Sequence, residues 1–290
     1  MNKNYDIVIV GGGPAGISAG IYCLRAGVKA LVLVANKSTL EEAKSIQNYY
    51  GIENISGKEL KEKGVKQLLS LGGEVLNEEV LKISQNFSDN TFNVKTIKCE
   101  YKAKVVILCT GTTKKKTIAE LENFENVSYC AICDGFFYSG KTVAVVGEGK
   151  FALSECEELK NVVDKIYLLT NGENIKVDNP KIEVVNKKIK LFNGKQRIDN
   201  VELADGSKIA VDGVFVASGS LSSFEISKQL GLITKNNFIV VDKNFLTNIN
   251  GVFAAGDVVG GLLQICKAVS DGAQAGLEAV RYLKIMEFKE

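Results

Sequence analysis

The sequence predicts an α/β fold built from two tandem three-layer units, the second of which is inserted into the first. Three observations lead to this prediction. Apolar strand-like runs alternate with helical patterns along the chain, as expected for parallel sheets with crossover helices. A strand that runs directly into a glycine-rich turn and a helix occurs twice, at residues 5–16 and 142–152. An apolar strand that closes a unit also occurs twice, at 104–109 and 212–219, which indicates two homologous Rossmann-like folds.

The individual elements follow from local patterns. After the first strand and its glycine turn, residues 17–26 predict a helix, and the apolar run at 30–34 predicts the next strand. A charged helix is expected at about 58–71, and a last helix at about 263–283. Because we assign the last helix to the first unit, we expect a discontinuous first domain with a second domain inserted in it.

The two parts of that domain are residues 1–113 and 243–290, and the inserted domain is residues 114–242.

Composition narrows the possible functions. The chain has 290 residues, of which 46% are hydrophobic and 24% are charged, values typical of a folded globular protein. A net charge of +2, without a basic helix, gives no reason to expect nucleic acid. The absence of histidine removes the commonest metal ligand and general base, and we expect no metal site.

Location is predicted from the same counts. The first strand begins within a few residues of the amino terminus, which leaves no room for a signal peptide. No apolar run approaches the roughly 20 residues that a membrane span requires. Five of the seven cysteines are scattered singly, which is unlike a secreted disulfide scaffold. These features predict a cytoplasmic protein.

The first glycine turn has the spacing of a dinucleotide-binding fingerprint. Gly11 allows a tight turn, Gly13 lets the backbone approach a pyrophosphate, and Gly16 permits close packing of helix and strand. Pro14 and Ala15 complete the turn, and the helix that follows has free N–H groups at its start. A turn that only packs a helix is the alternative, but the flanking strand and helix favour a nucleotide.

Cys130 and Cys133 form the only close cysteine pair in the chain. Cysteines at this spacing can form a disulfide across one turn, and a helix amino terminus favours the thiolate. The chain has no second pair and no histidine to complete a zinc site, and two buried small side chains remain the alternative. Asp134 is the acid nearest to the pair in the sequence, and it could equally be a helix cap.

Four segments together resemble the low-molecular-weight thioredoxin reductases over essentially the whole chain. They are the glycine turn at 11–16, CTGT at 109–112, CAICDGFFY at 130–138 and GDV at 256–258. The resemblance implies FAD in the first domain, with Asp257 on the ribityl chain and the start of the last helix near the pyrimidine end of the flavin. An ordinary helix cap at Asp257 and a turn residue at Asn48 are the alternatives. The residues assigned to FAD are Gly11, Gly13, Pro14, Ala15, Gly16, Asn48, Thr110, Gly111, Gly256, Asp257, Gln264 and Ile265.

The same resemblance implies a disulfide reductase that acts on thioredoxin and forms a homodimer. Cys133 would face the flavin, Cys130 would attack the disulfide of the partner, and Asp134 would supply the proton that the leaving thiolate needs. The sequence departs from the family near the flavin. Residues 38–42 replace a Gly-Gly-Gln loop, and Leu263 stands where an arginine is usual.

The second dinucleotide-binding pattern departs from the usual one where the pyrophosphate would bind and where a 2′-phosphate would bind. Glu148 puts a carboxylate where a pyrophosphate would approach, and Phe151 adds bulk beside the turn. No arginine follows the strand at 165–169, although arginine normally recognises a 2′-phosphate. NADPH binding is therefore not expected.

The chain resembles a ferredoxin-dependent branch of the family in this respect. We expect reduced ferredoxin to be the electron donor, with lysines such as 114–116 either on the docking face or in a plain solvated loop. The second domain would then serve as a carrier for the dithiol. A conventional NADPH-dependent thioredoxin reductase with an atypical nucleotide site, or a non-catalytic flavin-binding sensor, are the alternatives.

Overall fold

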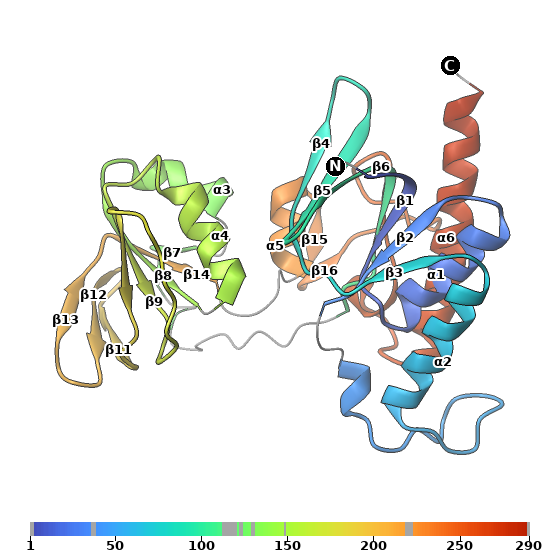
Figure 1. Cartoon of the computed structure of the whole chain (residues 1–290), viewed down its shortest axis with the longest axis horizontal. Coiled ribbons are helices and arrows are strands. Elements are labelled where there is room, and N and C mark those ends of the chain that lie inside the picture. The colour runs from blue at the N-terminus through green and yellow to red at the C-terminus, as the bar shows by residue number, and fades with distance from the viewer. Residues whose placement is uncertain are drawn as a thin grey trace. The chain divides into compact units, whose positions relative to one another are not determined.

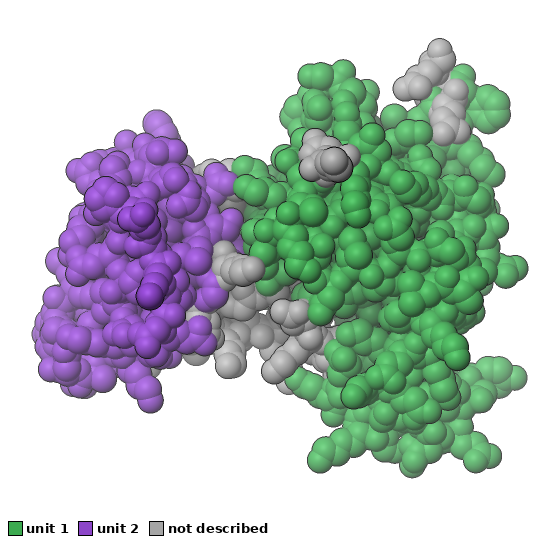
Figure 2. All heavy atoms as spheres, viewed as in Figure 1, with its two compact units in different colours: residues 1–113, 222–290 green, residues 114–221 purple. Residues whose placement is uncertain are grey.

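The computed structural model describes residues 3–35, 39–111, 121, 124–128, 131–147, 149–217 and 223–288. It divides into two compact units (Figures 1 and 2). Unit 1 is Met1–Thr113 with Ser222–Glu290, and unit 2 is Lys114–Leu221. Residues 222–242, which the sequence placed in the inserted domain, therefore belong to unit 1.

Unit 1 is built on a seven-stranded sheet in the order β3-β2-β1-β6-β5-β4, with β17 also paired to β6. The pairs among β3, β2, β1, β6 and β17 are all parallel, whereas β4 and β5 form an antiparallel hairpin on β6. The strands are β1 (Lys3–Val10), β2 (Ala30–Leu33), β3 (Glu74–Leu76), β4 (Val80–Asn86), β5 (Thr91–Thr96), β6 (Glu100–Leu108) and β17 (Val252–Ala254).

The helices of unit 1 come from both ends of the chain. The long C-terminal helix α6 packs along α1, and α1 also contacts α2. The helices and 3-10 turns are α1 (Pro14–Arg25), η1 (Thr39–Glu42), α2 (Gly57–Ser70), α5 (Ser223–Leu230), η4 (Gly256–Val259) and α6 (Ile265–Glu287). A small two-stranded sheet, β15 (Thr234–Lys235) with β16 (Phe238–Ile239), completes the unit.

The boundary shifts because α5 packs on the β4–β5 hairpin. The side-chain carbonyl of Gln229 accepts a hydrogen bond from the Ile83 N–H at 3.2 Å, and its amide donates to the Leu81 carbonyl at 3.4 Å. Ile239 of β16 is buried. The hydrogen bonds and the buried side chain tie this segment to unit 1, although no glycine- or proline-rich stretch marks the join in the sequence.

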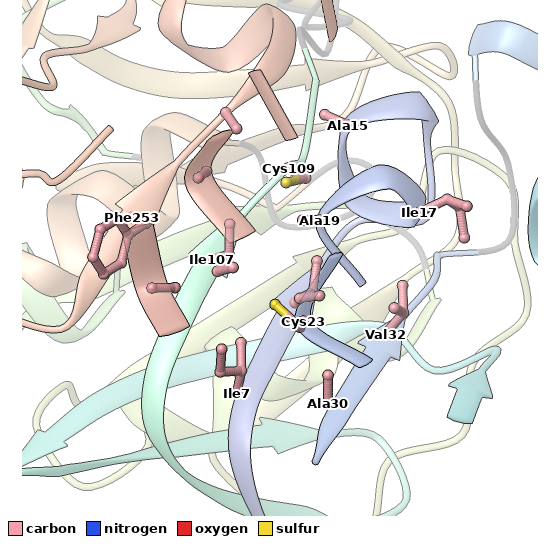
Figure 3. Close-up of a cluster of buried hydrophobic side chains, with 14 of the residues drawn as sticks. Ile7, Ala15, Ile17, Ala19, Cys23, Ala30, Val32, Ile107, Cys109 and Phe253 are labelled. Atoms are coloured by element: carbon pink, nitrogen blue, oxygen red, sulfur yellow. The ribbon is translucent and has the colours of Figure 1, made fainter. Parts of the chain in front are cut away.

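The core of unit 1 lies between α1, α6 and the sheet. Figure 3 shows Ala19 and Cys23 of α1 among side chains of the sheet, including Ile7 and Ile107. A Cβ added to Gly272 of α6 would lie only 2.0 Å from the carbonyl oxygen of Ala15. The two helices are therefore in backbone contact where α1 begins.

Unit 2 has a five-stranded sheet in the order β10-β9-β8-β14-β7, in which every pair is parallel. Its strands are β7 (Val127–Ser128), β8 (Thr142–Val146), β9 (Lys165–Leu169), β10 (Ile182–Val185) and β14 (Gly213–Val216). A separate antiparallel sheet consists of β11 (Ile189–Gly194), β12 (Ile198–Leu203) and β13 (Lys208–Ala210). The helical elements are α3 (Ala131–Asp134), η3 (Gly135–Tyr138) and α4 (Gly149–Leu159).

The two units repeat one construction, which confirms the predicted α/β fold with two Rossmann-like domains. In unit 1, a Cβ on Gly11 would lie 2.2 Å from the carbonyl oxygen of Cys109. In unit 2, a Cβ on Gly147 would lie 2.1 Å from the carbonyl oxygen of Ala217. In each unit the glycine turn after β1 or β8 thus touches the backbone just after the neighbouring parallel strand, β6 or β14. Among the residues that the structure describes, no helix is long and apolar enough to cross a bilayer.

Replacing Gly272 tests the helix contact. We expect Gly272→Ala to destabilise the folded protein by about 1–3 kcal/mol, because the new methyl group meets backbone that cannot rotate away. Gly64→Ala on α2 is a matched control, since its Cβ would meet only the Ile17 side chain at 3.1 Å. Urea unfolding followed by circular dichroism measures both variants. Equal stability of Gly272→Ala and the wild type would contradict this packing.

Candidate functional site

The first glycine turn connects β1 to α1 as the sequence predicts. Gly11 has a φ of +112°, and a Cβ on Gly16 would lie 1.8 Å from the Gly11 carbonyl oxygen. A Cβ on Gly13, in contrast, would meet no atom within 4 Å. Pro14 occupies the first turn of α1, where its missing N–H costs no hydrogen bond. The turn thus leaves open space in front of the free N–H groups of α1, as an anion site requires.

Thr110 and Asp257 are brought to the same edge of the sheet. β17 pairs with β6 in parallel, with Ala254 opposite Leu108, so that the loops that follow both strands begin side by side. The hydroxyl Oγ1 of Thr110 and the carboxylate Oδ1 of Asp257 are both buried without a hydrogen-bond partner. Buried polar atoms are nearly always paired, so these two oxygens indicate a polar ligand.

The pKa of Asp257 is raised above its ordinary value, mainly because the carboxyl group is partly buried. The positive charge of Lys267 opposes this increase, and the carboxylate of Asp271 adds to it. The carboxylate thus lies in a partly desolvated place whose nearby charges come from α6. The N-cap position of η4 is occupied by Ala255, and Asp257 lies inside the turn. The alternative of an ordinary helix cap at Asp257 therefore finds no support.

Asn48 and Gln264 meet although 216 positions separate them in the sequence. The Asn48 amide donates to the side-chain oxygen of Gln264 at 3.0 Å. Gln264 immediately precedes α6, which starts at Ile265. The structure thus brings together two residues assigned to the cofactor on separate motifs.

A cavity of about 420 Å³ begins at the glycine turn and runs between α1 and α2. Thr110 and Asp257 are not among its lining residues, so the cavity covers only part of the expected cofactor site. Its walls are mostly aliphatic, with tyrosine and lysine side chains among them. The residues that line it are Gly12, Gly13, Pro14, Ile17, Ser18, Ile21, Tyr22, Leu40, Tyr49, Ile52, Leu60, Lys61, Lys63, Gly64, Gln67, Ile265 and Val269.

The dithiol segment is described in part. Cys130 lies outside the described residues, as do Glu148 and Lys114 to Lys116, and of Cys133 the structure describes only the backbone in α3. Asp134 ends α3 and precedes η3, where its side chain makes no cap hydrogen bond. Its Oδ2 instead accepts a hydrogen bond from the buried Ser128 hydroxyl at 2.7 Å. The plain helix-cap alternative for Asp134 is thus not supported.

Glu155 is a residue near the dithiol that the sequence analysis missed. Its Oε2 accepts a hydrogen bond of 2.7 Å from the N–H of Ala131, the residue after Cys130, and the side chain is buried. The sequence carried a signal: Glu155 stands in the stripe of α4 that also buries Phe151, Ala152 and Leu159. A carboxylate in an apolar stripe needs a partner, and here that partner is the dithiol turn.

The described cysteines outside the pair are mostly unreactive. Burial raises the pKa of Cys23 to about 12 and that of Cys156 to about 12, and it raises the pKa of Cys109 further. At neutral pH these thiols stay protonated, and the thiolate is the reactive form. They behave as small apolar core residues.

Phe151, the bulky residue that the sequence places beside the second glycine turn, is buried in α4. Beyond β9, the Thr170 hydroxyl donates to the Glu173 carbonyl, and the Asn171 side chain accepts from the Ile189 N–H at 3.1 Å. The Thr170 side chain therefore bonds within the loop and the Asn171 side chain bonds to the start of β11, and no arginine lies between β9 and β10.

Comparison with known proteins supplies the family. A family model of pyridine nucleotide-disulphide oxidoreductases matches residues 5–272. A protein named thioredoxin reductase from Ureaplasma parvum serovar 3 is 32% identical and covers 98% of this chain and 98% of its own length. The chain belongs to the low-molecular-weight thioredoxin reductase family.

Solved structures of this family are similar over nearly the whole chain. The atypical thioredoxin reductase TRi of Desulfovibrio vulgaris Hildenborough superposes with a TM-score of 0.87 at 35% identity, covering 98% of this chain and 99% of that one. A ferredoxin-flavin thioredoxin reductase of Clostridium acetobutylicum gives 0.74 at 31% identity, covering 98% and 100%.

Members of the thioredoxin reductase family are FAD-binding flavoproteins, and FAD is the cofactor of this chain. The unpartnered oxygens of Thr110 and Asp257 and the open space at Gly13 fit such a ligand.

Glu155→Gln tests the carboxylate at the dithiol turn. Glutamine can still accept the Ala131 N–H but carries no charge, so we expect unchanged stability and a larger thiolate fraction at neutral pH. The rate at which iodoacetamide alkylates the reduced enzyme at pH 7 should rise several-fold. Glu157→Gln, at an exposed position of the same helix, should leave the rate unchanged. Equal rates in both variants would contradict an electrostatic effect of Glu155.

Proposed function

We propose that this flavoprotein reduces the disulfide of thioredoxin through Cys130 and Cys133, with electrons from reduced ferredoxin. The observation that carries the donor assignment is the loop after β9, whose Thr170 and Asn171 side chains bond to other protein groups and which offers no arginine to a 2′-phosphate. The likeness to a solved ferredoxin-flavin thioredoxin reductase supports the same assignment.

The thiol chemistry follows from the residues around the pair. FAD, once reduced, would supply the two electrons that open the Cys130–Cys133 disulfide to two thiols with the uptake of two protons, and two reduced ferredoxins would deliver those electrons one at a time. The Cys130 thiolate then attacks the disulfide of thioredoxin and forms a mixed disulfide. Cys133 attacks the Cys130 sulfur, which restores the internal disulfide and releases thioredoxin as a dithiol. Asp134, which accepts a hydrogen bond from Ser128, would supply a proton to the departing thiolate.

An exposed aromatic pair supports a protein substrate for the dithiol. Phe136 and Phe137 directly follow the Cys130–Asp134 turn, and they are 81% and 70% exposed. The next residue, Tyr138, is instead buried against Phe215 with its ring edge-on. Two adjacent exposed phenylalanines beside a reactive turn are typical of a contact site for another protein.

We also propose a homodimer and a cytoplasmic location. Unit 1 exposes large apolar side chains, among them Tyr50 at 99% and Leu262 at 62%, which a second subunit could cover. The single cysteines and the one dithiol fit a reducing compartment.

An anaerobic reduction experiment tests the donor. The oxidised yellow protein is mixed with reduced ferredoxin, NADPH or NADH, while flavin absorbance and the appearance of thioredoxin thiols are followed. We expect ferredoxin alone to bleach the flavin and to yield thioredoxin dithiol. Cys130→Ser should abolish the dithiol product, whereas Cys266→Ser, an exposed single cysteine, should not. Prompt bleaching by NADPH would overturn the donor assignment and indicate a conventional reductase. Full turnover by Cys130→Ser would indicate a flavin-binding protein of another kind.

Alanine replacement of Phe136 and Phe137 tests the contact site. Loss of both rings should raise the KM for thioredoxin at least fivefold, because aromatic side chains dominate such contacts, and should leave flavin reduction by the donor unchanged. Phe87→Ala in unit 1 is the matched control, since Phe87 is also 81% exposed. A KM that is the same in the double variant and the control would remove these phenylalanines from the thioredoxin site.

A further inference from the structure

An ion pair at the start of α6 lies against η4, the turn that contains Asp257. Lys267 Nζ lies 2.6 Å from the Asp271 carboxylate, one helical turn further along. The Lys267 side chain is only 20% exposed and that of Asp271 only 9%. Pairs of this spacing on an exposed helix surface contribute little, but this pair is largely shielded from water.

Both members of the pair bind the backbone of η4. The Asp271 carboxylate accepts the Gly256 N–H at 3.1 Å, and Lys267 Nζ donates to the Gly256 carbonyl at 3.0 Å. Lys267 also donates to the carbonyl of Gly260, at the other end of the turn. The N–H and the carbonyl of Gly256 are thus held by the same ion pair, and one ammonium group spans the turn from end to end.

Interactions within α6 do not favour a lysine at position 267. It is the third residue of α6, where the helix dipole disfavours a cation. The charge is compensated from outside the first turn, by Asp271 and by the two carbonyls of η4. Lys267 thus forms an ion pair with Asp271, and its charge also lowers the pKa of Asp257.

We propose that Lys267 is a positioning residue for FAD. It holds η4 so that the unpartnered Oδ1 of Asp257 faces the cofactor, and it supplies the positive charge that lets an anionic cofactor bind beside two carboxylates. This inference rests on the proposal that Asp257 contacts FAD. It adds to the FAD residues a side chain that lies outside every glycine or Gly-Asp motif.

Lys267→Met removes the charge and the donors while keeping a linear side chain. We expect the dissociation constant for FAD, measured by flavin fluorescence on titrating the FAD-depleted protein, to rise at least tenfold. The reduction potential of bound FAD should become more negative, because reduction adds negative charge that Lys267 no longer offsets. Lys284→Met, an exposed position on the same helix, is the control and should change neither quantity.

Asp271→Asn is the second variant, for the case that Lys267→Met does not fold. Asparagine still accepts the Gly256 N–H but leaves the Lys267 charge without its counter-ion. We expect FAD affinity within a few-fold of the wild type and a potential shifted in the positive direction. A purely structural role would give no shift, or shifts of the same sign in both variants. Either of those results, or an unchanged dissociation constant in Lys267→Met, overturns the inference.

Asp257→Ala separates this inference from the site proposal on which it rests. Loss of FAD binding in Asp257→Ala together with normal binding in Lys267→Met would overturn only the role of Lys267. Normal FAD binding in Asp257→Ala would show that the carboxylate does not hold FAD, and both proposals would then fail.

Discussion

The contact on which unit 1 depends is backbone against backbone where α1 begins. Gly16 lets α1 rest on the carbonyl of Gly11, and Gly272 lets α6 rest on the carbonyl of Ala15. Because no side chains intervene, the end of β1, the start of α1 and the first turns of α6 lie close together. The open space at Gly13 and the turn that carries Asp257 both lie at this junction, since Gly256 itself approaches the Ala15 side chain. The C-terminal quarter of the chain is thus required to complete a site that begins with its first strand.

Buried charge is the second organising feature, and each unit has its own example. Glu155 in unit 2 lies on an apolar stripe of α4, and Asp271 in unit 1 is buried on α6 one turn after its ion-pair partner Lys267. An unpaired carboxylate in such a place would be strongly unfavourable. Both are satisfied by a backbone N–H at a functional turn, Ala131 in one unit and Gly256 in the other. The cost of burying charge is therefore offset by fixing the two segments on which the chemistry is proposed to depend.

Unit 2 keeps the packing of a dinucleotide-binding fold but lacks residues that such a ligand requires. Its glycine turn keeps the contact between Gly147 and Ala217 that mirrors Gly11 and Cys109 in unit 1, because the turn after β8 lies against the end of the neighbouring strand β14. In the loop after β9, by contrast, Thr170 bonds to the Glu173 carbonyl and Asn171 bonds to the start of β11. A sheet of this kind is stabilised by its buried strands, so the ligand-facing loops can change without loss of the fold. That freedom is compatible with a domain retained to carry a dithiol.

The sequence by itself determined the α/β class, the doubled strand–turn–helix pattern and the residues of the glycine turn, because these depend on local spacing and periodicity. It also pointed to the dithiol and to the altered second turn. Only the tertiary structure decided that residues 222–242 belong with unit 1, since α5 is held there by Gln229 contacting strand β4. The meeting of Asn48 with Gln264 and the contact of Glu155 with the Ala131 N–H were likewise visible only there, because each joins elements that are separate in the sequence. The contacts of Ser128 and Lys267 join residues closer in the sequence, but they depend on how the chain turns between two elements, which no local pattern encodes.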